Sequence, residues 1–334
     1  MTRAGATALA VARATGLAGA RICRWTRAIN LSRPVGPSGC GHLGRRVEAI
    51  LIDRSPVRLR PHSCQRQPDV GCETEPVTSR LVVLGSCGAW PEAGRACSGF
   101  LLEHEGYRIV LDLGFGTLPR LLTRLNSSVA DGVDAVIVTH HHPDHMVDVH
   151  GLFRARWFGR REAEPVPLYA PTGVLDAVVA LEDGDVDTVA RVFDFHPLPA
   201  GPLPVGPFRL ESWVLPHFVP SVGVRLSDRD LTVAYTGDTG PDEALVDLGR
   251  DADLYVMEAT DRNQQRAVPQ ATNGQQMHLS ARDAGHAAAR AGARRLLLTH
   301  FWPGNDRETS RTAAADVFLG EVLIASEGLE VNLP

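Results

Sequence analysis

The chain has no lysine, so all 34 of its basic residues are arginine. This excludes every mechanism that needs a lysine amine as Schiff base, general base or phosphate-binding P-loop residue. Cysteine is also scarce, with six residues and no CxxC pair, which argues against a cysteine zinc knuckle. A chain with a large core needs no disulfide staples, and we therefore expect a reducing, cytoplasmic location.

Long apolar runs are missing as well. No stretch approaches 18 consecutive apolar residues, so we expect no membrane span. The 334 residues, 44% of them hydrophobic, nevertheless suffice for a sizeable core. Together these features predict one large domain with an appendage.

The appendage is expected at the amino terminus. Residues 1–78 hold 12 arginines and 5 acidic residues, a net charge of +7, which leaves −12 for residues 79–334 because the whole chain carries −5. Three interpretations compete: a disordered basic arm, a targeting segment, or translated upstream sequence outside the working protein. No compact apolar run follows a basic start, which disfavours a secretory signal, and Val77 would suit an alternative start. We expect residues 1–78 to be a disordered basic extension that is not part of the fold, and residues 79–334 to form the domain.

From residue 80 onward the pattern becomes regular. Short apolar runs bounded by glycine or polar turns predict strands, and apolar positions at helical spacing predict helices. The predicted strands are 80–84, 98–103, 108–112, 134–139, 166–170, 208–215, 222–226, 231–236, 254–258 and 295–299. The predicted helices are 118–125, 146–158, 280–291 and 311–319. Strands come first and then mix with helices, an order that favours sheets covered by helices.

A cluster of metal-binding side chains follows the strand predicted at 134–139. The segment reads His140, His141, His142, Pro143, Asp144 and His145. Imidazole and carboxylate together suit zinc, manganese or iron(II). The i, i+2 pair His140 and His142 can converge on one ion, while Asp144 and His145 can serve a second. His141 is expected to face away as an ordinary polar loop residue.

Three further candidate ligands lie just past later strands: His217, Asp238 and His300. Each has an ordinary alternative when taken alone, because lone histidines are usually surface or satisfied residues and Gly-Asp-Thr is a common turn. Their shared position after a strand favours a role as ligands, since the ends of several strands can meet on one rim of a sandwich.

These motifs resemble those of the metallo-β-lactamase superfamily, and within it the ribonuclease Z-like branch, over about residues 80–334. The motifs are HHHPDH at 140–145, HFVPSVGVR at 217–225, YTGDT at 235–239, HLSARDAG at 278–285 and LTHF at 298–301. The resemblance implies an α/β fold, the four-layer αββα sandwich, with the metal site on one edge. It also implies a set of ligands: His140, His142 and His217 for one metal, Asp144, His145 and His300 for the other, and Asp238 bridging both. True β-lactamases often place a cysteine where this chain has Asp238, which argues against lactam hydrolysis.

The expected cofactors are two divalent metal ions, zinc first and manganese as the alternative. Such a pair would hold a shared hydroxide as the nucleophile, with Asp144 doubling as its orienting base. His278 is the candidate proton donor, since it precedes the capping box opened by Ser280 and the resembled branch has a catalytic histidine in this motif. The alternative for His278 is a capping or packing role. Asp112 and Glu258 are weighed evenly between orienting ligands and serving in turns or packing.

The substrate is the least constrained prediction. The likeness is greatest to actinobacterial cyclic-nucleotide phosphodiesterases described as atypical class II enzymes, so we expect phosphodiester hydrolysis of a small cyclic nucleotide. The alternative of tRNA 3′-end processing is weakened by the −12 charge and by the lack of a long basic Gly/Pro-rich insertion that could hold RNA. A thioester or lactone hydrolase would use the same metals without His278.

A metal-bound scaffold without catalysis is disfavoured by the complete set of ligands. The resemblance alone implies a homodimer. Stacking on a base is conceivable for several aromatic residues, although packing is the commoner role: Trp157, Phe158, Phe218 and Trp302.

Overall fold

The computed structural model describes residues 79–160, 162–261, 264 and 276–334. The extension predicted at residues 1–78 lies outside these described residues. Nearly all of the predicted domain, by contrast, is described, and it falls within one compact unit of the chain.

The first sheet has seven strands within the described residues, six from the amino-terminal half and one from the carboxyl end. In sheet order these are β14 (Glu330–Asn332), β1 (Arg80–Gly85), β2 (Gly99–His104), β3 (Tyr107–Leu113), β4 (Ala135–Ile137), β5 (Val166–Ala170) and β6 (Phe193–Pro197). β1 to β3 are antiparallel neighbours, whereas β3 to β6 run parallel. Every residue of β4 is apolar and buried, as expected of a parallel strand covered on both faces.

The second sheet also has seven strands within the described residues. In sheet order these are β13 (Glu321–Ile324), β12 (Arg295–Thr299), β11 (Leu254–Glu258), β10 (Thr232–Tyr235), β9 (Ser221–Ser227), β8 (Phe208–Leu215) and β7 (Leu203–Val205). β10 to β13 run parallel, and β7 to β10 form an antiparallel meander. β8 and β10 therefore point the same way, and both end on the same edge of the sheet.

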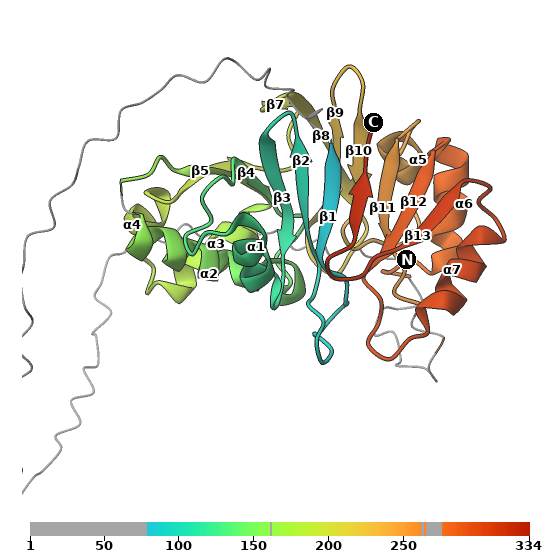
Figure 1. Cartoon of the computed structure of the whole chain (residues 1–334), viewed down its shortest axis with the longest axis horizontal. Coiled ribbons are helices and arrows are strands. Elements are labelled where there is room, and N and C mark those ends of the chain that lie inside the picture. Colours follow the sequence, from blue (N-terminus) through green and yellow to red (C-terminus); the bar gives the residue numbers. More distant parts are fainter. Residues whose placement is uncertain (1–78, 161, 262–263, 265–275) are drawn as a thin grey trace, which may run out of the picture. The chain divides into compact units, whose positions relative to one another are not determined.

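Helices cover the outer face of each sheet (Figure 1). On the first sheet these are α1 (Thr117–Leu125), α2 (Pro143–Gly159), α3 (Thr172–Leu181) and α4 (Val186–Ala190). On the second sheet these are α5 (Ala244–Leu248), α6 (Ala281–Ala291) and α7 (Arg307–Ala315). A third apolar core lies between the sheets, where Phe100 and Ile137 of the first pack with Val224 and Val256 of the second. The order helix, sheet, sheet, helix confirms the predicted four-layer sandwich.

The helix predicted at 280–291 is confirmed in detail. Ser280 caps it by accepting a hydrogen bond from the Asp283 amide, and the Asp283 carboxylate accepts one from the Ser280 amide, so the predicted capping box is present. Gly292 ends the helix in the left-handed region at φ 71°, which glycine adopts without strain.

Two helix predictions were wrong at their boundaries. The last helix, predicted at 311–319, runs from Arg307 to Ala315, because the Asp306 side chain accepts the Glu308 amide and caps it earlier. α2 begins at Pro143 and not at residue 146, since proline suits the first helical position. Among the described residues, none of the helices has both the length and the apolarity that crossing a bilayer requires.

Candidate metal centre

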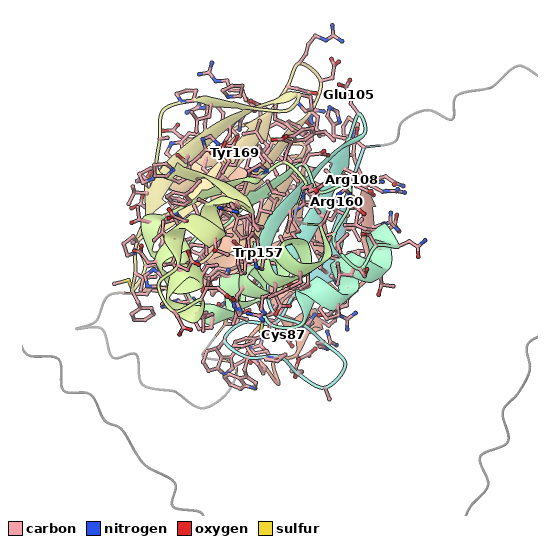
Figure 2. The ribbon with its side chains drawn as sticks, turned by 90° about the vertical axis from the view of Figure 1, so that its left-hand side faces the viewer. Cys87, Glu105, Arg108, Trp157, Arg160 and Tyr169 are labelled. Atoms are coloured by element: carbon pink, nitrogen blue, oxygen red, sulfur yellow. The ribbon has the colours of Figure 1, made fainter. Side chains whose placement is uncertain are left out.

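The chemistry-bearing segments meet at one edge of the two sheets. Strands β4, β8, β10 and β12 all end there, shortly before His140, His217, Asp238 and His300 respectively. Cys87, just past β1, lies toward this end in Figure 2, and Glu105 in the β2–β3 turn lies at the opposite end. The carboxyl ends of parallel strands share an edge, which is why candidate ligands far apart in sequence converge.

Asp144 and His145 are held by a helix. They occupy the first turn of α2, which begins three residues before the start predicted at residue 146. The amide groups at a helix N-terminus carry partial positive charge, which favours the carboxylate of Asp144 in that position. The helix also gives both side chains a fixed direction.

The first group contains His140, His142, His217 and Asp238, whose candidate ligand atoms all lie within 4.8 Å of one another. His142 Nδ1 lies 3.1 Å from both His140 Nε2 and His217 Nε2. Two donors bound to one zinc ion at about 2.0–2.1 Å in a tetrahedron would be about 3.3 Å apart. The spacing of these nitrogens therefore fits a single ion.

The second group contains Asp144, His145, His300 and again Asp238. His300 Nε2 lies 3.2 Å from Asp144 Oδ2 and 3.2 Å from Asp238 Oδ2. His145 Nε2 lies 3.1 Å from Asp238 Oδ1. The structure thus brings together all seven predicted ligands, in the two groups expected, with Asp238 common to both. Their role as metal ligands stays a prediction.

Two unsatisfied atoms of the second group fit a bound cation. His145 Nε2 and Asp238 Oδ1 are buried and have no hydrogen-bond partner with acceptable geometry among the described residues, although they lie 3.1 Å apart. Buried polar atoms are normally satisfied, so this pair calls for a ligand. Imidazole nitrogens and carboxylate oxygens are the donors that zinc and manganese accept.

The outer nitrogens of the histidines are held by oxygen atoms. His145 Nδ1 donates to Asp112 Oδ2 at 2.7 Å, and His217 Nδ1 donates to the Met277 carbonyl at 3.1 Å. Such bonds fix the tautomer that leaves Nε2 with its lone pair directed inward. His142 is different, because it presents Nδ1 to the first group.

Asp112 is more than a turn residue. It is fully buried, and its carboxylate accepts hydrogen bonds from the Thr139 amide at 2.7 Å, the Thr139 hydroxyl at 3.0 Å, His145 at 2.7 Å and the Tyr235 hydroxyl at 2.6 Å. It therefore links β3, the segment after β4, α2 and β10 directly behind His145.

The charges and the burial of the site residues favour binding of a cation. Burial lowers the pKa of His140, and it lowers that of His217 to about 4, so both rings are neutral at neutral pH, as ligands must be. Burial acts against charge on His145 too, but the surrounding carboxylates, chiefly Asp238 and Asp144, outweigh it and raise the pKa of this ring. A bound cation would replace the proton that these carboxylates attract.

His278 lies beside the second group, at the N-terminal end of α6. Its Nδ1 is 3.0 Å from Glu258 Oε2 and 3.8 Å from Asp238 Oδ2. Glu258 is fully buried, accepts the Thr239 amide through Oε1 at 2.6 Å, and accepts the Thr260 hydroxyl through Oε2. Both oxygens are thus occupied by hydrogen bonds, which suits an orienting acceptor better than a metal ligand.

Two contacts of the site had not been anticipated. The Ala89 amide donates to Asp144 Oδ2 at 2.7 Å, and the Thr260 hydroxyl accepts from His300 Nδ1 at 2.9 Å. A backbone amide carries no sequence signal, and a threonine two residues past Glu258 carries only a weak one. His141 belongs to neither group, and its ring lies against Gly173 of α3.

Comparison with known proteins agrees with this architecture. The family model described as beta-lactamase superfamily domain matches residues 107–301. An uncharacterized protein of Mycobacterium leprae is 32% identical over 81% of this chain and 95% of its own length. The ribonuclease Z of Kineococcus radiotolerans is 31% identical over 72% of this chain and 90% of its own length.

A solved structure shows the same similarity to this family. The metallo-beta-lactamase fold protein YhfI of Bacillus subtilis superimposes with a TM-score of 0.65 and 28% identity, covering 76% of this chain and 99% of YhfI. The chain therefore belongs to the β-lactamase superfamily of metallo-hydrolases, close to YhfI and to ribonuclease Z-like proteins.

Proposed function

We propose that this chain is a binuclear metal-dependent phosphodiesterase that acts on a small nucleotide, with a cyclic nucleotide as the preferred substrate. The observation that carries the proposal is the His278–Glu258 pair, 3.0 Å between its closest atoms, placed beside two ligand groups that share Asp238. Hydrolysis of a phosphodiester needs both charge stabilisation at the phosphoryl group and a proton for the leaving alkoxide. This site offers residues for both tasks.

The two ligand groups would hold two divalent ions, zinc first and manganese as the alternative. His140, His142 and His217 would bind one, Asp144, His145 and His300 the other, and Asp238 both. Bound there, the ions would supply Lewis acidity, which lowers the pKa of water and withdraws negative charge from phosphoryl oxygens.

Asp144 would both bind a metal ion and orient the attacking water. Its Oδ2 accepts the Ala89 amide at 2.7 Å and lies 3.2 Å from His300 Nε2, so the carboxylate is fixed between the loop after β1 and the end of β12. Burial tends to raise its pKa, but His145 and His300 outweigh burial and hold the pKa below its usual range. An ionised Asp144 can accept a hydrogen bond from the attacking water.

His278 would donate the proton to the leaving group. Its Nδ1 is engaged with Glu258 Oε2, which fixes the orientation of the ring. The proton to be transferred then resides on Nε2, and its loss returns the ring to the neutral state. A thioester expels a thiolate, which needs no comparable donor, so the donor favours a substrate that expels an alkoxide, such as a phosphodiester.

Ribonuclease Z-like cleavage of RNA is the second candidate. It is favoured by the 31% identity to the ribonuclease Z of Kineococcus radiotolerans over 72% of this chain. The −12 net charge of residues 79–334 counts against it, because a large polyanion binds best to a basic surface. We therefore place the small nucleotide first.

The test is a comparison of substrates and variants. The full chain, loaded with zinc or manganese, is assayed on cyclic AMP, bis-p-nitrophenyl phosphate, a pre-tRNA and an acyl lactone. Asp144→Ala should abolish cyclic AMP turnover, and His278→Ala should lower kcat by about 10²–10⁴-fold. His286→Ala is the matched control, since His286 is an exposed histidine on α6 itself.

The result that contradicts the proposal is equally concrete. Lactone turnover that His278→Ala leaves intact, together with no phosphodiester turnover, would assign the chain to acyl chemistry. Cleavage of pre-tRNA at a higher kcat/KM than of any small phosphodiester would favour the second candidate.

A further inference from the structure

Two tryptophans form a pair next to the candidate metal centre. The rings of Trp90 and Trp302 lie 5.0 Å apart between centroids and meet edge to face at 82°. Trp90 is 47% exposed, although an indole is among the side chains with most to gain from burial. Trp90 therefore keeps aromatic surface available to a ligand.

Backbone contacts place this pair at the second ligand group. The Gly88 amide donates to the Phe301 carbonyl at 2.9 Å, and the Phe301 amide donates to the Ser86 carbonyl at 3.0 Å, so the two segments lie side by side. A Cβ on Gly88 would come within 2.6 Å of the His300 ring. Only backbone therefore separates the Trp90 loop from this candidate ligand.

The residues next to the tryptophans contact the same carboxylate. The Ala89 amide and His300 Nε2 lie 2.7 Å and 3.2 Å from Asp144 Oδ2. Trp90 directly follows Ala89, about 3.8 Å along the chain, and Trp302 is two residues past His300, at most about 7 Å away. The pair is therefore within one nucleotide's length of the place where a phosphoryl group would bind.

The backbone that presents Trp90 is held in an unfavourable conformation. Ala89 has a φ of 60°, in the left-handed region that a residue with a Cβ rarely adopts. Such conformations persist where surrounding contacts impose them, and they gather at functional sites. Here the contact that holds this conformation is the hydrogen bond from the Ala89 amide to Asp144 Oδ2.

We infer that Trp90, supported by Trp302, stacks on the planar base of the nucleotide whose phosphodiester is cleaved at the metal centre. The inference rests on the proposed function and names the part of the substrate that this site selects. A stacking platform recognises any flat heteroaromatic ring and distinguishes it from a bare sugar phosphate.

Phe218 is another exposed aromatic residue near the site. It contacts the His278 ring, so replacing Phe218 would disturb the proposed proton donor as well as any stacking.

The test measures binding rather than turnover. Isothermal titration of the zinc-loaded full chain gives the dissociation constants of adenosine 5′-monophosphate and ribose 5-phosphate, which differ by the base alone. The wild type should bind the nucleotide about 5- to 100-fold more tightly. Trp90→Ala should remove most of this preference and leave ribose 5-phosphate binding unchanged, whereas Trp90→Phe should keep much of it.

Phe158→Ala is the matched control. Phe158 is 58% exposed, and it lies 14 residues beyond Asp144 on α2, about 21 Å along the helix. It should keep the full preference for the nucleotide.

Three outcomes would overturn the inference: a wild type without preference for the nucleotide or without binding to it, a preference that survives Trp90→Ala, or an equal loss for both ligands. The last would mean that Trp90 only supports the fold. Because binding is measured apart from turnover, a chain that prefers the nucleotide yet cleaves no phosphodiester would sink the proposed function alone.

Discussion

At the residue scale, the site depends on side chains that do not themselves face the candidate metals. Asp112 is fully buried, has a φ of 54°, and accepts four hydrogen bonds from Thr139, His145 and Tyr235. A buried carboxylate is costly unless its oxygens are satisfied, and here they are. Its effect on His145 is to hold Nδ1 protonated and to direct Nε2 toward Asp238.

Replacing Asp112 should therefore weaken metal binding. We expect Asp112→Asn to reduce zinc affinity by about 10- to 100-fold, because the amide holds His145 less firmly and carries no charge. Competition with a chromophoric chelator measures this. Asp134→Asn is the control. The Asp134 carboxylate accepts a hydrogen bond from the Arg108 amide of β3, the strand that also carries Asp112, and it contacts none of the candidate metal ligands. Equal affinity in Asp112→Asn and wild type would contradict the role.

The cysteines of the described part remain consistent with the sequence interpretation. Cys87 and Cys97 are buried and unpaired thiols. Burial raises the pKa of both, which keeps them protonated and poorly reactive. The expectation of a reducing compartment stays a prediction.

At the element scale, an ion network fastens the first sheet to its helix. Glu103 on β2 lies 2.6 Å from Arg80 of β1, 3.0 Å from Arg108 of β3 and 3.1 Å from Arg124 of α1. Burial acts to raise the Glu103 pKa, but the three arginines outweigh it and the pKa is lowered from 4.5. The unfolded chain therefore binds the proton more readily than the folded chain.

This gives a pH-dependent stability. The contribution of Glu103 is present above about pH 4.5 and is lost as the pH falls through the lower pKa of the folded state. Glu103→Gln should lower the free energy of unfolding by about 1 kcal/mol at pH 7, since the arginines are partly solvent-screened. The difference from wild type should shrink as the pH falls to 3.

Urea unfolding at both pH values provides the measurement. Glu105→Gln is the control, because Glu105 is exposed in the β2–β3 turn, where Figure 2 shows it at the tip of the sheet. A deficit in Glu103→Gln that stays constant from pH 7 to pH 3 would show that charge is not the cause.

Sequence patterns predicted many of the elements and missed others. β4 and β11 lie in apolar runs and were found. β7 with three residues and α5 with five have too few positions to show a period. Length is not the whole reason, because α3 with ten residues was missed as well, as was β6. The start of α7 was missed because its cap, Asp306, follows a Gly-Asn turn that hides the helical pattern. Edge strands β13 and β14 are half exposed, so their composition resembles that of loops.

At the scale of the whole molecule, the convergence of the candidate ligands could be predicted for a geometric reason. Each candidate ligand outside α2 follows an apolar strand, and strand ends on one edge must meet. Contacts made by the Ala89 amide and the Met277 carbonyl could not be predicted, because every residue carries these backbone groups and the contacts depend on how loops approach. The contact of the Thr260 hydroxyl has only a weak sequence signal. The partner, dimer and compartment predictions remain untested.

We also propose that residues 1–78 are dispensable. The described chain is anchored from its first residue, since the Ser79 hydroxyl bonds His104 at 2.7 Å and the Ser79 carbonyl accepts the Leu333 amide at 2.8 Å. A chain that begins at Val77 should keep the Tm and the phosphodiester turnover of the full chain. Loss of turnover at unchanged Tm would instead give the basic residues a role in the substrate site.

The central claim is that seven side chains from both sheets hold two metal ions. Inductively coupled plasma mass spectrometry of the full chain, after loading with zinc and removal of excess metal, tests it directly. We predict two ions per chain, about one in His217→Ala or His300→Ala, and fewer than one in Asp238→Ala, which removes the ligand common to both groups. A wild-type chain that retains no metal, or variants that retain as much as wild type, would contradict the account.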